Sequence, residues 1–326
     1  MKSDEDKGRA TQRQERNARA DNFDYSFQMR IGMGFDGGGT KTDCLLLLES
    51  GKVLGRGRAG ASNPSRIGIE AAAQSVRDAA IAALANAEIQ MAHVTDVCAG
   101  LAGVALAERA RAMIAHLREF FGTARFELCT DLDLALASAG PPPAMVLVAG
   151  TGSAAIGHVA NRPPIRSGGH GPKQSDEGSA FAIGKNVVKH LAALTLDGES
   201  LRERIVQLFP TTSLQLLASL EGAEADAVYP RIFPLVAIAA DEGDELAQKL
   251  LNEAAQNLAS FVAEVKQQLH LGDEIFTLGK TGGMMGRSKY FDAQLNQALH
   301  DIAPRAKIQH LQTPLVEIAA KRALGL

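Results

Sequence analysis

The sequence has no tryptophan, only three cysteines, no long apolar run and no excess of one charge. Its longest apolar stretches, "CLLLL" and "AMVLVAG", have the length of a strand, far below the roughly 20 residues that a membrane span needs. Lys and Arg number 34 against 37 Asp and Glu, and outside the N-terminal tail the basic residues are scattered, so we expect no nucleic-acid partner. These shortages argue against a membrane protein and a nucleic-acid-binding protein. A chain of 326 residues with 46% hydrophobic side chains is long enough for two soluble domains.

The three cysteines show neither the spacing of a metal site nor that of a redox motif. Cys44, Cys98 and Cys129 lie in or at the end of apolar segments, without C-x-x-C or Cys/His pairs around them. We therefore expect buried, reduced thiols in a cytoplasmic protein. Residues 1–28 are polar, with mixed charge and no hydrophobic core for a signal peptide, and we predict a disordered tail upstream of a native start at Met29.

The rest of the chain divides into two α/β halves with the same layout. In each half the pattern predicts strands in a meander, the first two joined by a glycine turn, and then helices alternating with strands. The expected strands are 30–35, 43–48, 53–59, 94–99 and 125–129 in the first half, two within "MVLVAGTGSAAIGHVA", one at "PIRSGG", and 274–278 and 307–311 in the second. Helices are expected over 68–86, 106–121, after residue 130, through most of 177–271, and over 290–302 and 314–324.

Each half opens with a glycine turn between two strands, at Asp36 to Thr40 and at Gly150 to Ser153. A G-x-G-x-x-G match (Gly32, Gly34, Gly37) ends in the first turn, but a dinucleotide fingerprint leads into a helix and this one leads into a strand. A Walker loop also fails, because Thr40 precedes Lys41. Successive glycine N–H groups bind anions well, and Asp36 at the end of a buried strand suits Mg²⁺ bound through water. One such loop would fit a plain hairpin with a solvated aspartate; two at corresponding points favour phosphate binding.

Five segments in a fixed order carry a family resemblance: "GFDGGGTKTD", "SNPSRIG", "GLAG", "TDLDLAL" and "AGTGSAAIG", followed by "GGHGPKQSDEGSA". They run from Gly34 to Ala180, and a weaker match continues through "LGKTGG". The chain resembles the N-acetylglucosamine kinase branch of the BadF/BadG/BcrA/BcrD ATPase family. The resemblance implies an α/β fold of two ribonuclease H-like (actin-like ATPase) domains flanking a nucleotide cleft. Residues 29–140 would form the sugar side and 141–326 the adenosine side, with the last helix packed back on the first domain.

The resemblance also implies ATP and Mg²⁺ as cofactors and a role for each matching residue. Asp131 matches the catalytic base, and Asp36 would hold Mg²⁺ through water. The nucleotide would be held by Gly37, Gly38, Gly39, Thr40 and Lys41, by Gly150, Thr151, Gly152 and Ser153, and, at the adenosine, by Gly282 and Gly283. The sugar would contact Asn63, Gly169, His170 and Asp176.

Several of these residues also have a plainer interpretation, which the sequence leaves open. Lys41 fits a solvated strand position, Asn63 before Pro64 fits a turn, and Gly282 with Gly283 fits a stop before a helix. Asp131 or Asp133 fits a helix N-cap. Asp176 and Glu177 fit the positive end of a helix.

The expected function is an ATP-dependent amino-sugar kinase that phosphorylates a small-molecule sugar, at its 6-hydroxyl, and acts as a homodimer. His170 and Ser175 replace the family's usual aromatic residue and glycine, which weakens the expectation of strict N-acetyl recognition. The alternatives are an iron-sulfur reductase activator, for which the cysteines lie at the wrong places, and a chaperone-like nucleotide-regulated protein. Zinc-bearing sugar kinases need a cysteine cluster that this sequence lacks.

Overall fold

The computed structural model describes residues 29–169, 171, 176–193 and 199–326. The predicted tail at 1–28 lies outside the described residues. Two compact units account for the rest: residues 29–134 with Thr313–Leu326, and Ala135–Gln312. The division falls after Leu134, six residues before the boundary expected from the sequence at residue 140.

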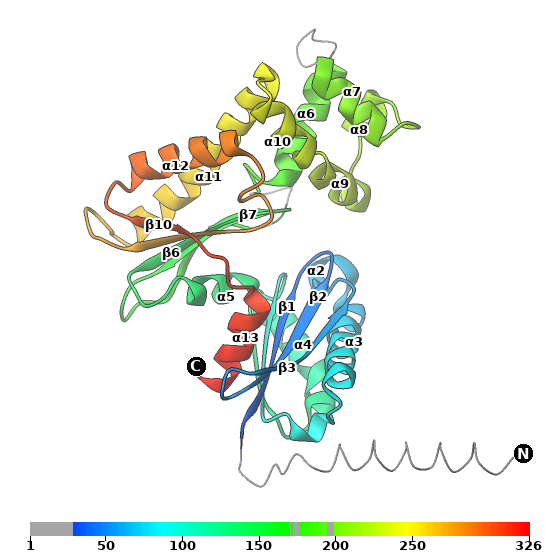
Figure 1. Cartoon of the computed structure of the whole chain (residues 1–326), viewed down its shortest axis with the longest axis vertical. Helices are drawn as coiled ribbons and strands as arrows, with labels where there is room; N and C mark the ends of the chain where they lie inside the picture. The colour runs from blue at the N-terminus through cyan, green and yellow to red at the C-terminus, as the bar shows by residue number, and fades with distance from the viewer. Residues whose placement is uncertain (1–28, 170, 172–175, 194–198) are drawn as a thin grey trace, which may run out of the picture. The chain divides into compact units, whose positions relative to one another are not determined.

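The first unit is a mixed five-stranded sheet in the order β3-β2-β1-β4-β5 (Figure 1). β1 pairs antiparallel with β2 and parallel with β4, and β4 pairs parallel with β5. Its strands are β1 (Ile31–Gly37), β2 (Thr42–Leu48), β3 (Val53–Ala59), β4 (Asp96–Leu101) and β5 (Arg125–Cys129). Its helices are α2 (Pro64–Ile67), α3 (Ile69–Ala87), α4 (Ala107–Phe121), α5 (Asp131–Ser138), which runs on into the second unit, and α13 (Leu315–Leu324).

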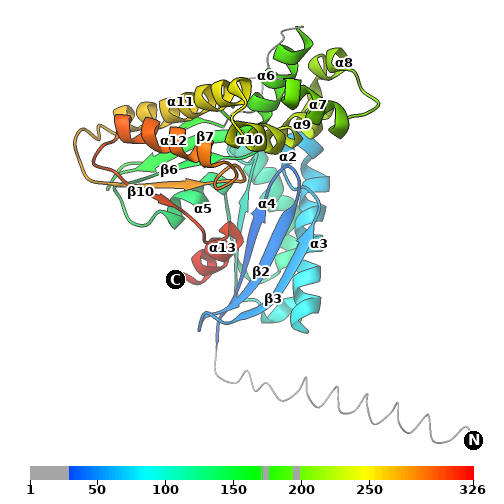
Figure 2. The ribbon, with the colours of Figure 1, turned by 45° about the horizontal axis from the view of Figure 1, so that its top comes forward.

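Helices cover both faces of this sheet, which explains why β2 is apolar almost throughout. Leu45 and Leu47 pack with residues of α13, whereas Leu46 and Leu48 point to the opposite face and join the core beneath α3 and α4. Figures 1 and 2 show α13 on one side of β1 and β2, and α3 on the other. Alternate residues of one strand therefore fill two separate cores.

Two glycines of β1 allow α13 to approach the sheet at backbone distance. A Cβ on Gly34 would lie 2.1 Å from the amide nitrogen of Ala320, and one on Gly32 would lie 2.7 Å from Cγ of Leu324. These contacts explain the first two glycines of the G-x-G-x-x-G match by helix packing. The C-terminal helix thus belongs to the first unit although it follows the second in sequence.

The second unit repeats the same strand order in a sheet that runs β10-β9-β6-β7-β8. Its strands are β6 (Ala144–Ala149), β7 (Ser153–His158), β8 (Ile165–Gly168), β9 (Thr277–Thr281) and β10 (Lys307–His310). Its helices are α6 (Ala180–Ala192), α7 (Glu199–Leu208), α8 (Leu214–Ala218), α9 (Gly222–Val228), α10 (Phe233–Asp241), α11 (Glu245–Gln268) and α12 (Lys289–Ile302). One apolar core joins α6, α10, α11 and α12 to the sheet.

The expected elements are present, with one clear shift in position. The strand expected over 274–278 is β9, Thr277–Thr281, and it pairs parallel with β6 through Thr281. The sequence misled because β9 contains a lysine: Lys280 is buried, donates to Oδ1 of Asn296 on α12, and has its pKa lowered by desolvation. In the sequence, the lysine therefore makes a buried strand position look polar.

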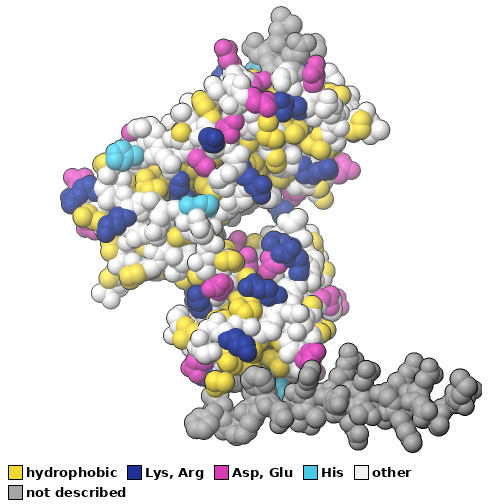
Figure 3. All heavy atoms as spheres, in the orientation of Figure 1, with side chains coloured by type: hydrophobic (Ala, Val, Ile, Leu, Met, Phe, Trp, Pro, Cys, Tyr) yellow, Lys and Arg dark blue, Asp and Glu magenta, His cyan; other side chains and the backbone are white. Residues whose placement is uncertain are grey.

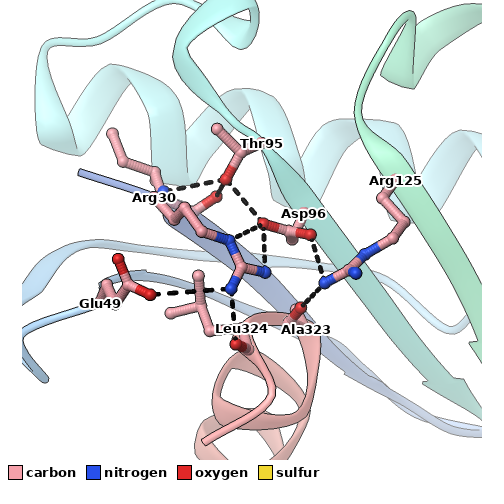
Figure 4. Close-up of polar contacts among 8 residues, drawn as sticks. Arg30, Glu49, Thr95, Asp96, Arg125, Ala323 and Leu324 are labelled. Carbon is pink, nitrogen blue, oxygen red and sulfur yellow. Dashed lines mark hydrogen bonds and ion pairs between the residues drawn. The ribbon is translucent and has the colours of Figure 1, made fainter. Parts of the chain in front are cut away.

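An ionic cluster ties the N-terminal edge of the first sheet to the end of α13 (Figure 4). Asp96 is buried and binds two guanidinium groups, that of Arg30 at 2.8 Å and that of Arg125 at 2.6 Å. The same arginines donate to the carbonyl oxygens of Leu324 and Ala323. Positive charge at the C-terminus of α13 satisfies carbonyls that have no partner within the helix.

The surface is mixed in charge. Figure 3 shows Lys and Arg side chains interspersed with Asp and Glu on the face that it draws. Within the described residues, no helix is long and apolar enough to cross a membrane. The absence of a nucleic-acid partner stays a prediction.

Candidate active site

Two carboxylates lie at the carboxyl edge of the first sheet. Asp36, the last residue but one of β1, lies opposite Gly100 of β4, and Gly100 is in turn opposite Cys129 of β5. Asp131 begins α5 two residues after Cys129. Because the carboxyl ends of parallel strands meet at one edge, the topology brings Asp36 and Asp131 together, and their charges influence each other.

The environment of Asp36 opposes its ionisation. Burial raises the pKa of this carboxyl to about 6, and the negative charges of Asp131 and Asp43 add to the rise. Lys41 acts in the opposite direction. A half-buried carboxyl near other acids is the arrangement that a bound cation would relieve.

Helix α5 is capped by residues other than Asp131. The side chain of Thr130 accepts from the backbone N–H of Asp133 at 3.1 Å, and Asp133 in return accepts from the backbone N–H of Thr130 at 2.9 Å. This reciprocal pair is a capping box. The capping role that the sequence left open between Asp131 and Asp133 is filled by Thr130 and Asp133.

A glycine in β4 sets the position of the helix that carries Asp131. A Cβ on Gly100 would lie 2.0 Å from Cδ1 of Leu134, so α5 packs directly over the strand. Leu134 is fully buried. The start of α5 is therefore fixed both by its cap and by this contact.

The three glycines of the first loop differ in their surroundings. A Cβ on Gly37 would lie 2.1 Å from Oγ of Ser62, and one on Gly39 would lie 2.8 Å from Nη1 of Arg66. At Gly38 no atom lies within 4 Å of that position, and its backbone is outside the left-handed region. Neither packing nor conformation requires glycine at 38, whereas a ligand that approaches the backbone there would.

Lys41 is exposed and pairs with Asp43, as does Arg58. Nζ of Lys41 and Nε of Arg58 each lie 2.5 Å from a carboxylate oxygen of Asp43. These two cations lower the pKa of Asp43 against the opposing effect of burial. In this structure Lys41 therefore forms an ion pair with Asp43. The preceding residue, Thr40, is exposed.

The segment "SNPSRIG" is tied to the first glycine loop. The backbone N–H of Ser62 donates to the carbonyl of Gly38 at 2.9 Å. Asn63 is the N-cap of the short helix α2, its Oδ1 accepting from the backbone N–H of Ser65 at 3.0 Å. A Cβ on Gly103 would lie 2.1 Å from that Oδ1, so the segment "GLAG" also packs against Asn63.

The second unit carries its glycine loop at the corresponding edge. Gly150 lies beside Gly283, whose nitrogen is 3.5 Å from the position of a Cβ on Gly150. Gly282 has a φ of 113°, and a Cβ there would lie 2.2 Å from the carbonyl oxygen of Ala149. At Gly283 no atom lies within 4 Å of that position, as at Gly38. The structure thus brings the predicted phosphate and adenosine glycines of this unit together.

Asp176 is buried beside the second loop. One carboxylate oxygen lies 3.0 Å from the position of a Cβ on Gly152. Ser153 donates to the carbonyl of Glu177 at 2.8 Å, and the N-cap of α6 is Ser179. Asp176 thus lies three residues before the N-cap of α6.

Two further residues predicted to contact ligands are Thr151 and Gly169. Thr151 is exposed, and Gly169 follows β8 with a φ of 73°. His170 and Ser175 lie outside the described residues. Cys44 and Cys98 are buried and Cys129 is half-buried. Among the described residues no three His, Cys, Asp or Glu side chains converge as a metal-binding group.

Sequence reasoning missed Arg66, whose guanidinium lies against Gly39. The only indication in the sequence was that Arg66 lies three residues after Asn63 in the segment "SNPSRIG". A helix as short as α2, Pro64–Ile67, leaves little periodicity to detect.

Two sheets of one strand order, each with a glycine turn at its edge, define the class of ribonuclease H-like ATPase folds. The sequence model of the BadF/BadG/BcrA/BcrD ATPase family matches residues 33–319. The chain belongs to this family, which confirms the resemblance in the sequence.

Individual relatives agree with that assignment. The chain is 26% identical over 295 residues to an N-acetyl-D-glucosamine kinase of Dictyostelium discoideum, covering 85% of this chain and 92% of the relative. It is 24% identical over 286 residues to an N-acetylmuramic acid/N-acetylglucosamine kinase of Clostridium acetobutylicum, covering 86% and 94%. A candidate N-acetylglucosamine kinase from Chromobacterium violaceum has a similar structure, with a TM-score of 0.70 at 24% identity over 90% of this chain and 98% of that one. This similarity confirms the predicted fold.

Proposed function

We propose that the protein is an ATP-dependent amino-sugar kinase that transfers the γ-phosphate of ATP to a hexosamine hydroxyl, the 6-hydroxyl. The observation that carries the proposal is the pair of carboxylates, Asp36 and Asp131, at one sheet edge beside a glycine loop. Phosphoryl transfer to an alcohol needs one carboxylate to take the hydroxyl proton and another to hold the metal ion.

The nucleotide loops fit phosphate by their open backbone. Gly38 in the first unit and Gly283 in the second are glycines that neither a neighbouring atom nor a left-handed backbone requires. We assign Gly37 to Lys41 of the first unit and Gly150 to Ser153 of the second unit to phosphate, and Gly282 with Gly283 to the adenosine. Backbone N–H groups supply the donors in such loops.

Asp36 is assigned to Mg²⁺. Its carboxylate would hold the ion through bound water, since Mg²⁺ prefers oxygen ligands and usually keeps several waters. When bound, the ion neutralises charge on the phosphates and so assists transfer. A cation at this place would also lower the pKa that burial and Asp131 raise.

Asp131 acts as the general base. It accepts the proton of the sugar hydroxyl as that oxygen forms a bond to the γ phosphorus, and the bond to the bridging oxygen breaks to release ADP. Because Thr130 and Asp133 cap α5, the carboxylate of Asp131 is not needed for that purpose. Its place at the helix N-terminus stabilises the charged form that a base requires.

The sugar is assigned to Asn63, Asp176, Gly169 and His170. Carboxylate and amide groups can each bind one or two hydroxyls. The two kinases named above act on N-acetylglucosamine, and one of them also on N-acetylmuramic acid. With His170 in place of the usual aromatic residue, we expect weaker discrimination between N-acetylated and free amino sugars. A cytoplasmic location fits a kinase that consumes ATP. That the protein forms a homodimer stays a prediction.

A coupled ADP-release assay over N-acetylglucosamine, glucosamine, N-acetylmannosamine, glucose and mannose, with Mg²⁺, tests the proposal. We expect the amino sugars to raise ADP release well above the rate without sugar, with a phosphorylated product detected by mass spectrometry. ADP release that no sugar on the panel stimulates would contradict a sugar kinase and favour a nucleotide-regulated ATPase. A strong response to N-acetylated sugars alone would refute the expected weak discrimination.

A further inference from the structure

One cation of the first unit lies directly against the glycine loop. The guanidinium of Arg66 reaches the tip of the loop, with Nη1 at 2.8 Å and Cζ at 3.4 Å from the position of a Cβ on Gly39. Arg66 is exposed, so its charged group is accessible from solvent. The contact exists because residue 39 is glycine, since any side chain there would displace the guanidinium.

The segment that carries Arg66 is anchored to the same loop. Ser62 donates from its backbone N–H to the carbonyl of Gly38, and the N–H of Arg66 donates to the carbonyl of Asn63 at 3.0 Å. Ser62 is fully buried beneath Gly37. Loop and arginine are therefore joined by backbone hydrogen bonds and packing, which fixes where the base of the side chain lies.

Two further cations of the first unit share one acid. Lys41 and Arg58 both pair with Asp43. One carboxylate between two cations neutralises part of their charge. The guanidinium of Arg66 lies against Gly39, within the loop that we assign to phosphate.

We propose that Arg66 contacts the terminal phosphate of the nucleotide and stabilises the charge on the phosphoryl group during transfer. The proposal rests on the kinase function above and assigns to Arg66 the role that the sequence suggested for Lys41. Guanidinium is planar and always charged, and it presents paired donors that match phosphate oxygens. As the sugar oxygen attacks and ADP leaves, charge gathers on the oxygens of the transferring group, where a fixed cation is most effective.

Two measurements on Arg66→Ala and Arg66→Lys test the assignment. The first compares, by calorimetry with Mg²⁺ and no sugar, the binding of ADP and of a non-hydrolysable ATP analogue. Loss of a charge-assisted hydrogen bond to the terminal phosphate should weaken analogue binding by about tenfold or more in Arg66→Ala, while ADP affinity changes less than about twofold because ADP lacks that phosphate. The second measures steady-state turnover, where kcat should fall by about 10² to 10³. Arg66→Lys, which keeps a point charge without the fork, should recover part of the loss.

Arg56→Ala is the matched control, an exposed arginine on β3 of the same unit. It should leave both nucleotide affinities and kcat unchanged. Equal weakening of ADP and analogue, or unchanged analogue affinity, overturns the assignment. If the wild-type protein phosphorylates no sugar, the kinase function fails, yet the calorimetric comparison still decides whether Arg66 reads the terminal phosphate.

Discussion

Gly38→Ala separates ligand binding from folding, because the structure gives no packing reason for glycine at this position. No atom lies within 4 Å of the place where the new methyl group would sit, and the backbone is outside the left-handed region. Such a replacement stabilises a folded protein by about 0.4–1 kcal/mol, mainly by restricting the unfolded chain. We therefore expect the ligand-free variant to melt at the same temperature as the wild type or slightly higher.

The effect on ATP should have the opposite sign. A methyl group on Gly38 would hold a phosphate away from the loop backbone, and a hydrogen bond to a charged group contributes about 1.5–3 kcal/mol. That loss corresponds to a roughly 10- to 150-fold weaker affinity for Mg·ATP. Thermal unfolding of the ligand-free protein and calorimetry with Mg·ATP measure the two effects separately.

Two further glycines provide controls for this experiment. Gly272→Ala, at another open position in the second unit, should match Gly38→Ala in stability and leave ATP affinity unchanged. Gly37→Ala should lower the free energy of unfolding, because its methyl group would lie 2.1 Å from Oγ of the buried Ser62. If Gly38→Ala is stable and keeps wild-type ATP affinity within about twofold, phosphate does not approach this loop and the reasoning is wrong.

Two more predictions concern charges of the first unit. The pKa of Asp36 is raised from 3.8 to about 6, so the folded state holds the proton more tightly and the free energy of unfolding falls as pH rises from about 4 to 6. Asp36→Asn should remove this slope and raise the free energy of unfolding at pH 7 without ligand by up to about 3 kcal/mol. It should also weaken Mg²⁺-dependent ATP binding. Urea titrations from pH 4 to 8 and calorimetry check the two effects, and an unchanged slope would refute the assignment to Asp36. Asp96→Ala leaves Arg30 and Arg125 without their shared partner. Because both arginines reach solvent, we expect the free energy of unfolding in urea to fall by about 2–3 kcal/mol, less than the 3–5 kcal/mol for breaking a fully buried pair. ATP affinity should be unchanged. A fall of less than about 1 kcal/mol would show that this ionic cluster does not stabilise the fold.

The sequence predicts the parts of the site that depend on local pattern. A glycine turn between two apolar strands fixes where Asp36 lies, and a strand followed by Thr130 fixes the start of the helix with Asp131. Both follow from rules that act over a few residues. The parallel sheet then brings the two acids to one edge.

Contacts between distant segments were beyond the sequence. Nothing near Gly34 indicates that Ala320 of the last helix would pack upon it, because the two are far apart in the chain. The placing of Arg66 over Gly39 depends on side-chain directions that no periodicity encodes. Lys280, a buried cation in a strand, contradicts the composition rule on which strand prediction rests.

The turnover of Asp131→Asn tests the central claim most directly. The substitution keeps the shape of the side chain and removes the base, while Thr130 and Asp133 still cap α5. We expect kcat for amino-sugar phosphorylation to fall by about 10² to 10⁴, with Mg·ATP affinity within about twofold of the wild type, whereas Asp133→Asn lowers stability slightly and keeps turnover. If Asp131→Asn retains more than about a tenth of wild-type turnover, less of a loss than removal of a general base allows, Asp131 is not the base and the proposed mechanism is wrong.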